Sequence, residues 1–90
     1  MPAYITLQFT DLFLQSFSDR QLKAADRAAI LKALQLLDQN DRHPSLRVHP
    51  LLGNMAGSWS ASASRSLRIV FERLDDGGKQ LISCSHHYDE

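Results

Sequence analysis

The side chains best suited to proton transfer are concentrated in two short segments of the chain. All four histidines lie either in a central segment, as His43 and His49, or close to the end, as His86 and His87. The unperturbed pKa of imidazole lies near neutral pH, so two such rings could act as general base and general acid. No cysteine cluster accompanies them at metal-ligand spacing, and we expect no metal ion and no cofactor.

The positive charge is concentrated in the middle third of the chain, entirely as arginine. Residues 42–70 hold four arginines and no acid, a charge of +4. Residues 1–41 carry four basic and five acidic side chains (−1), and residues 71–90 carry two and five (−3), so the whole chain sums to zero. The four arginines are Arg42, Arg47, Arg65 and Arg68. A guanidinium presents a planar fork of donors that suits phosphate oxygens. The alternative for any one of them is an ordinary solvated surface cation.

Length and composition favour one domain, residues 1–90, with one modest core. No apolar run approaches the roughly 20 residues that a bilayer span needs, and the N-terminus lacks the pattern of a signal peptide. The single cysteine, Cys84, cannot form an internal disulfide. Its position in an apolar alternation predicts a small buried side chain. These features indicate a cytoplasmic protein without a membrane partner.

Periodicity predicts a strand and two helices in the first half. Alternating β-branched and aromatic residues predict a strand over Tyr4–Phe9. Thr10 is a suitable N-cap for a short helix over residues 11–17. Ser18, with Gln21 three residues later, is expected to cap a second helix that contains the run LKAADRAAILKALQLLDQN. Its apolar face consists of Ile30, Ala33, Leu34 and Leu37, and Asn40 and Asp41 end it.

After Pro50 the period changes to two. The runs SWSASAS, LRIVFERL and KQLISCSHH predict three consecutive strands, with a turn at Asp75–Gly78 between the last two. Hairpin connections imply antiparallel pairing, and the helices must cover one face of the sheet. The predicted fold is therefore α+β in two layers, β-α-α-β-β-β, with an antiparallel curled sheet packed against two N-terminal helices.

This pattern resembles the RelE/ParE superfamily of toxins from type II toxin–antitoxin systems, and most of all its YafQ-like branch of mRNA interferases. Members typically show His-Pro-Leu, a glycine turn, Gly-x-Trp or Gly-x-Tyr, and Arg-(Ile/Leu)-(Ile/Val)-(Phe/Tyr). The corresponding residues here are His49-Pro50-Leu51, Gly57-Ser58-Trp59 and Arg68-Ile69-Val70-Phe71, followed by a histidine at the end of the last strand. The resemblance covers nearly the whole chain in order and length.

The resemblance implies a RelE-like fold and an endoribonuclease. Most members enter the ribosomal A site and cut messenger RNA, and a bound antitoxin blocks them. In such a cleavage the RNA 2′-hydroxyl loses a proton and attacks the adjacent phosphorus, and the departing 5′-oxygen gains a proton. Histidines suit both transfers, and a guanidinium stabilises the additional negative charge of the transition state. This reaction needs no metal.

The family's functional residues map onto several positions of this chain. His49 matches a histidine of the YafQ-like branch and is the first candidate for general base or acid. Arg68 matches the arginine at the scissile phosphate of RelE-like members. His86 and His87 compete for the terminal histidine, since side chains alternate along a strand and only one of them can share a face with Arg68. The candidates for substrate binding are Arg47, Arg65 and Tyr88, the last as a stacking platform or proton donor.

The chain also departs from the family pattern. Ser62 and Ser66 stand where YafQ-like toxins place a further histidine and an acidic residue, and a serine hydroxyl does not exchange its proton near neutral pH. The chain is therefore either a nuclease with a reduced set of residues or a weakened toxin. Two other functions remain open, namely a ParE-like toxin that inhibits a protein such as DNA gyrase, and a degenerate toxin that only binds an antitoxin.

The implied partners are messenger RNA, the ribosome and a cognate antitoxin. A small open sheet with one helical layer leaves a surface that an extended or amphipathic antitoxin segment could cover. Because the middle third is positive, we expect that segment to be acidic and to place carboxylates over Arg65 and Arg68. A toxin–antitoxin heterotetramer is one expected assembly.

Overall fold

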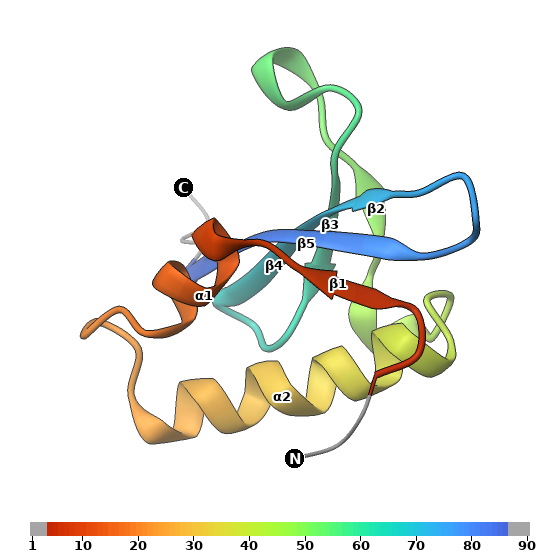
Figure 1. Ribbon diagram of the computed structural model, residues 1–90. Helices are drawn as coiled ribbons and strands as arrows, with labels where there is room; N and C mark the ends of the chain where they lie inside the picture. Colours follow the sequence, from red (N-terminus) through yellow and green to blue (C-terminus); the bar gives the residue numbers. More distant parts are fainter. Residues whose placement is uncertain (1–3, 87–90) are drawn as a thin grey trace.

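A five-stranded sheet and two helices make up the part of the chain that the structure describes. The structure is a computed structural model, and it describes residues 4–86. The elements follow the order β1 (Leu7–Phe9), α1 (Asp11–Phe17), α2 (Ala24–Gln39), β2 (His49–Pro50), β3 (Trp59–Ser62), β4 (Leu67–Arg73) and β5 (Lys79–His86). Two short 3-10 turns, Pro44–Leu46 and Gly53–Met55, flank β2, and the second projects away from the body of the molecule (Figure 1). None of the helices between residues 4 and 86 has the length and hydrophobicity of a membrane-spanning segment.

The sheet has the order β1-β5-β4-β3-β2 and is mixed. The strands β2 to β5 pair antiparallel with their sequence neighbours, as their short connections require. The α+β, two-layer prediction is confirmed, but the prediction of a wholly antiparallel sheet is wrong in one pairing, because β1 lies parallel to β5. The two strands are joined through both helices and the other strands, so no hairpin fixes their relative direction. The sequence analysis predicts four strands. The two-residue strand β2, at one edge of the sheet, is a fifth.

The helix boundaries follow from capping, with one difference from the sequence prediction. Thr10 caps α1 as predicted, since its hydroxyl accepts a hydrogen bond from the backbone N–H of Phe13 at 3.0 Å. The predicted cap of the second helix at Ser18 is wrong, because α2 begins at Ala24. The guanidinium of Arg27 donates to three backbone carbonyls of the preceding connection, those of Phe17, Asp19 and Leu22. These bonds hold the connection as a compact turn instead of a helical one.

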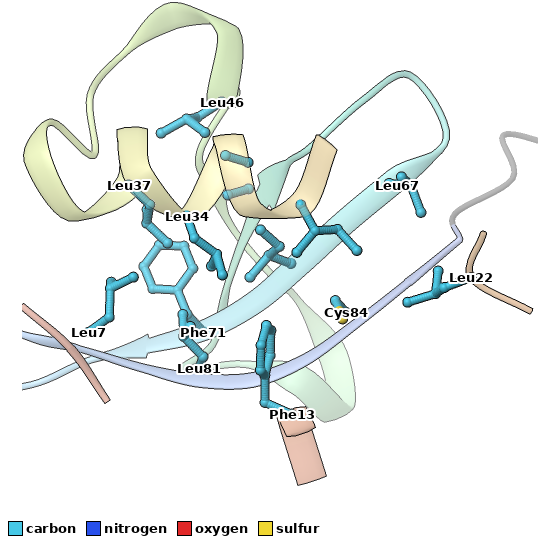
Figure 2. Close-up of a cluster of buried hydrophobic side chains, with 14 residues drawn as sticks. Leu7, Phe13, Leu22, Leu34, Leu37, Leu46, Leu67, Phe71, Leu81 and Cys84 are labelled. Carbon is cyan, nitrogen blue, oxygen red and sulfur yellow. The ribbon is translucent and has the colours of Figure 1, made fainter. Parts of the chain in front are cut away.

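One face of the sheet carries the core. The cross-strand register puts Ala61, Ile69 and Cys84 in one row, and side chains two residues away along each strand share their face. This face of the sheet, here called the helix face, packs against α1 and α2 in a single buried cluster (Figure 2). The largest buried side chains of the cluster are Phe13, Ile30, Leu34, Leu37, Leu46, Ile69, Phe71 and Leu81. Cys84 is buried as predicted.

A polar junction fixes the start of β1 to the C-terminal end of α2. The Asp38 carboxylate accepts hydrogen bonds from the backbone N–H groups of Ile5 and Thr6 and from the Thr6 hydroxyl at 2.6 Å. Lys79, at the first position of β5, is 6 % exposed and donates from Nζ to the Leu37 carbonyl at 3.0 Å and to Thr6 Oγ1 at 3.2 Å. Three segments far apart in sequence are therefore joined by one carboxylate and one ammonium.

This junction predicts a loss of stability in acid. Burial raises the pKa of Asp38, but hydrogen bonds from Thr6 and Ile5 and the charge of Lys79 lower it by more, so the pKa lies below its usual value. The stabilisation is therefore complete above the unfolded pKa of about 3.9 and is lost as the pH falls through the lower folded value. We expect the unfolding free energy, measured in urea from pH 7 to pH 2, to fall below about pH 4.

The matched variants for this titration are Asp38→Asn and Asp75→Asn. Asp75 is exposed in the turn between β4 and β5. The Asp38 variant should lose less stability than wild type between pH 4 and pH 2, because it has removed one of the groups that titrate. The Asp75 variant should follow the wild-type curve. Identical acid slopes for all three proteins would contradict this account of the junction.

Candidate functional site

The sheet face turned away from the helices, here called the open face, carries two of the predicted catalytic residues. His49 on β2 pairs with Ser60 on β3, and Ser60 pairs with Val70 on β4. Arg68 lies two residues before Val70 and therefore on the same face. Two inter-strand spacings, about 10 Å, separate β2 from β4, so a ligand lying across β3 would contact both side chains.

The ring of His49 is exposed, and its geometry suits a base. Its Nδ1 lies 3.2 Å from the carbonyl oxygen of Pro50. A carbonyl oxygen only accepts hydrogen bonds, so Nδ1 must carry the hydrogen. In the neutral ring the basic nitrogen is then Nε2, which has no hydrogen-bond partner among the described residues. This arrangement makes Nε2 available to take a proton from a ligand.

Arg68 is flanked on the open face by hydroxyl groups. Its cross-strand partners are Ser62 on β3 and Ser85 on β5. Its Nε is buried and has no hydrogen-bond partner among residues 4–86. A guanidinium stays protonated at any physiological pH and donates only. The site therefore presents a fixed positive charge between two hydroxyls, which is the chemistry that binds a phosphate oxygen.

Ser85 is a residue that the sequence reasoning missed as part of this site. The signal for it was the alternation in LISCS, which places a second serine next to the cysteine of the core. Ser62, which appears in the sequence only as the loss of a family histidine, occupies the other side of Arg68.

An open groove next to Arg68 brings together Arg47 and Arg65, the two arginines predicted to bind substrate. The groove, here called the arginine groove, has a volume of about 950 Å³. It is lined by Pro44, Ser45, Arg47, Ser62, Ala63, Ser64 and Arg65. None of these side chains is acidic, so the groove combines positive charge with serine hydroxyls. Ser62 connects it to Arg68, because the two residues are cross-strand partners.

Arg47 adopts a backbone conformation that side chains with a Cβ rarely take. It is the C-cap of the turn Pro44–Leu46, with φ of 46° and ψ of 46°, and no other described non-glycine residue has a positive φ. The left-handed conformation costs a non-glycine residue about 1–2 kcal/mol. The chain tolerates this strain at the point where it turns into β2 and places an arginine beside the groove.

This strain predicts opposite effects of two substitutions at position 47. Asparagine tolerates the left-handed region, whereas a β-branched residue does not. We expect Arg47→Asn to leave the unfolding free energy in urea unchanged or slightly higher. Arg47→Val should lower it by more than about 1 kcal/mol. Equal stabilities of the two variants would show that position 47 is not held in the left-handed region.

The structure does not bring His86 together with His49 and Arg68. His86 pairs with Leu67, a buried residue of the helix face, so its ring is directed toward the helices. Its Nε2 lies 3.3 Å from the carboxylate of Asp26 in the first turn of α2. An open-face role for His86 therefore does not fit its position. His87 and Tyr88 lie outside the described residues. Among residues 4–86, no group of three or more histidine, cysteine or carboxylate side chains is placed to hold a metal ion.

Comparison with solved structures finds the same fold in toxins of toxin–antitoxin systems. A YoeB/ParE toxin from Agrobacterium tumefaciens superposes with a TM-score of 0.72 at 22% identity, over 93% of this chain and 100% of that one. YafQ from E. coli strain BL21(DE3) superposes with a TM-score of 0.73 at 16% identity, over 89% of this chain and 90% of YafQ. A chain of the toxin–antitoxin complex RelBE2 from Mycobacterium tuberculosis gives 0.67 at 20% identity, over 94% and 100%.

These likenesses show the fold. No protein-family model matches the sequence, and no curated protein matches it significantly. The RelE/ParE-like fold that the sequence motifs indicate, including its likeness to YafQ, is confirmed by the structural neighbours.

Proposed function

We propose that this chain is the toxin of a type II toxin–antitoxin system and that it cleaves messenger RNA on the ribosome without a metal ion. The observation that carries the proposal is the common placement of His49 and Arg68 on the open face, beside a groove lined by Arg47 and Arg65. An imidazole with a free basic nitrogen suits the general base of this reaction, and a guanidinium suits the group that stabilises the charge of its transition state.

The roles follow from the chemistry of each group. Nε2 of His49 takes the proton of the 2′-hydroxyl as the oxygen attacks the adjacent phosphorus. Arg68 binds a non-bridging oxygen of that phosphate, where negative charge increases in the transition state. The bond from phosphorus to the 5′-oxygen then breaks, and this oxygen receives a proton from a general acid. The products are a 2′,3′-cyclic phosphate and a 5′-hydroxyl.

The general acid is assigned on sequence grounds alone. The alternation that directs His86 toward the helices leaves His87 as the terminal histidine to test, with Tyr88 as the second candidate. The arginine groove would hold the neighbouring phosphates through Arg47 and Arg65. Ser62 replaces a proton-transfer group of YafQ-like toxins with a hydroxyl donor. We therefore expect a slower nuclease than those toxins, rather than an inactive one.

The proposed antitoxin would act by covering the open face. The RelBE2 structure is a toxin–antitoxin complex of a protein with this fold. An acidic antitoxin segment that places carboxylates over Arg65 and Arg68 would neutralise the charge that binds RNA. We place the toxin and its antitoxin in the cytoplasm, where messenger RNA and ribosomes are found.

The proposal is tested by inducing the wild-type chain and its variants in growing cells. Growth and the 5′ ends of cellular RNA are recorded for wild type, His49→Ala, His86→Ala and His87→Ala. We expect growth arrest and new RNA ends with wild type, and loss of both with His49→Ala and His87→Ala. His86→Ala, which changes a helix-face residue, should still produce new RNA ends.

Two outcomes contradict the nuclease proposal. A wild-type chain that arrests growth while messages stay intact and replication stalls would support the ParE-like alternative, in which the toxin inhibits a protein such as DNA gyrase. A wild-type chain that is harmless and cuts no RNA would support a degenerate toxin that only binds its antitoxin.

A further inference from the structure

A second cavity lies beside the arginine groove and is not used by the proposed reaction. Its volume is about 330 Å³, and its lining includes Arg42, His43, Arg47, Trp59 and Arg73 together with Asp41. We call it the tryptophan pocket. Trp59 pairs with Phe71 and so lies on the helix face, whereas the catalytic candidates lie on the open face. The pocket therefore occupies the opposite side of the sheet at its β2 edge.

Among the described residues, the acidic group of this pocket is Asp41, and it is already neutralised. Asp41 forms an ion pair with Arg73. The guanidinium of Arg73 also stacks on the ring of Trp59, with its central carbon 4.5 Å from the ring centroid. Asp41, Arg73 and Trp59 thus form one stacked unit, which fixes the tryptophan ring as a wall of the pocket.

The remaining polar groups of the pocket are hydrogen-bond donors. Nδ1 of His43 accepts a hydrogen bond from the backbone N–H of Ser45 at 3.2 Å, so Nε2 carries the hydrogen in the neutral ring. Arg42 and Arg47 are exposed, and their guanidinium groups have no ion-pair partner among the described residues. A pocket with these donors and one neutralised carboxylate selects an anion rich in oxygen atoms.

The tryptophan pocket adjoins the arginine groove. Both are lined by Pro44 and Arg47, so Arg47 stands between them. We propose that the tryptophan pocket binds a phosphodiester of the same RNA strand that lies on the open face, at a nucleotide flanking the scissile bond. This inference rests on the proposed function. A strand that passes around the β2 edge would meet Arg68, Arg65, Arg47 and Arg42 in turn.

The distribution of charge favours a nucleic acid over an acidic peptide. The arginines lie along a path through two cavities. This arrangement matches a nucleic acid strand, which carries one negative phosphate per nucleotide. The Trp59 ring, with the Arg73 guanidinium stacked on it, lines the pocket, so a bound nucleotide would lie next to an aromatic side chain. An acidic peptide could form ion pairs with the arginines, but its carboxylates would form no stacking contact with the Trp59 ring.

The fluorescence of Trp59 provides a direct test, because it is the single tryptophan of the chain. The probes are 2′-deoxy oligonucleotides of three and nine nucleotides, which lack the attacking hydroxyl. They are titrated into wild type, Arg42→Ala and the control Arg20→Ala, in which an exposed arginine far from the pocket in sequence is changed. The dissociation constant is measured at several salt concentrations.

We expect the nonanucleotide to change the Trp59 fluorescence and the Arg42→Ala variant to bind it roughly 3- to 10-fold more weakly, as for one solvent-exposed charged contact. The slope of log affinity against log salt should decrease by about 0.7, the value for one phosphate contact to a single strand. The trinucleotide should bind wild type and Arg42→Ala equally, and Arg20→Ala should resemble wild type throughout.

Two results would overturn this inference. The first is equal affinity of wild type and Arg42→Ala for the nonanucleotide. The second is an Arg42-dependent fluorescence change with poly-glutamate but not with the oligonucleotide, which would assign the pocket to a protein ligand. Failure of the proposed function is distinguishable from failure of this inference, because cleavage and binding are measured separately. A wild-type chain that cuts no RNA could still bind the nonanucleotide in an Arg42-dependent way. A chain that cleaves RNA but binds it independently of Arg42 would reject the pocket alone.

Discussion

Arg68→Gln should reduce RNA cleavage by about 10²- to 10³-fold, the usual effect of removing one preorganised donor at developing negative charge. Arg68 projects from the middle strand of the sheet, between Ser62 and Ser85, and its Nε is buried without a hydrogen-bond partner in residues 4–86. Its charge is held on a rigid strand, and no carboxylate of residues 4–86 forms an ion pair with it. Glutamine retains a hydrogen-bond donor but lacks the charge and the planar fork.

The measurement is single-turnover cleavage of ribosome-bound messenger RNA by purified protein. Arg68→Lys should retain part of the activity, because it keeps a positive charge without the geometry of the guanidinium. Arg20→Ala should cleave at the wild-type rate, and the thermal melting of each variant checks that the fold is intact. An Arg68→Gln variant that melts like wild type and cleaves within a few-fold of it would remove Arg68 from the site.

Lys79→Ala should lower the unfolding free energy by about 2–4 kcal/mol, the range for leaving a buried carbonyl without its donor and opening a cavity. The Lys79 ammonium donates to the Leu37 carbonyl and to Thr6 Oγ1, and its charge stabilises the ionised Asp38. Alanine leaves the carbonyl without this donor, leaves Asp38 without its nearby cation, and opens a cavity at the start of β5. A domain of this size has only about 5–10 kcal/mol of stability to lose.

Equilibrium unfolding in urea at pH 7 tests this expectation. Lys79→Met keeps most of the buried volume, so its loss should be smaller than that of the alanine variant. Lys32→Ala, which shortens an exposed lysine of α2, should stay within about 0.5 kcal/mol of wild type. If Lys79→Ala were no less stable than Lys32→Ala, the junction of β1, α2 and β5 would not depend on the buried ammonium.

The parts of the fold that could be predicted are those with strong local signals. The apolar face of α2, with Ile30, Leu34 and Leu37, is buried as its spacing indicates. The alternation in LRIVFERL places Ile69 inside and Arg68 outside, as β4 has them. The first strand is shorter than predicted, because the N–H groups of Ile5 and Thr6 bind the Asp38 carboxylate. That contact spans more than thirty residues and leaves no local trace in the sequence.

The sequence gives two opposite predictions for His86, because counting by twos from the buried Cys84 places it on the helix face and counting from Leu81 places it on the open face. Counting by twos from Leu81 would turn Ser83 and Ser85 toward the helices and His86 toward the open face. The register shifts between Val70 and Phe71, so that Ser83 faces Val70 and Leu81 faces Phe71. The extra residue on β5 reverses the faces of all the residues after it. A single-residue irregularity therefore separates His86 from Arg68, and the coordinates agree with the count from Cys84.

The proposed chemistry is tested most directly by the ends of the RNA that the purified chain produces. Ribosome-bound messenger RNA is incubated with wild-type protein in a buffer whose magnesium keeps the ribosomes intact, and the chemical groups at the fragment ends are determined. Attack by the 2′-hydroxyl predicts fragments with a 2′,3′-cyclic phosphate and a 5′-hydroxyl, formed with wild type and not with His49→Ala. A message with a single 2′-deoxy substitution at the cleavage site should remain intact. Fragments with a 3′-hydroxyl and a 5′-phosphate, or cleavage at the 2′-deoxy position, would contradict the account.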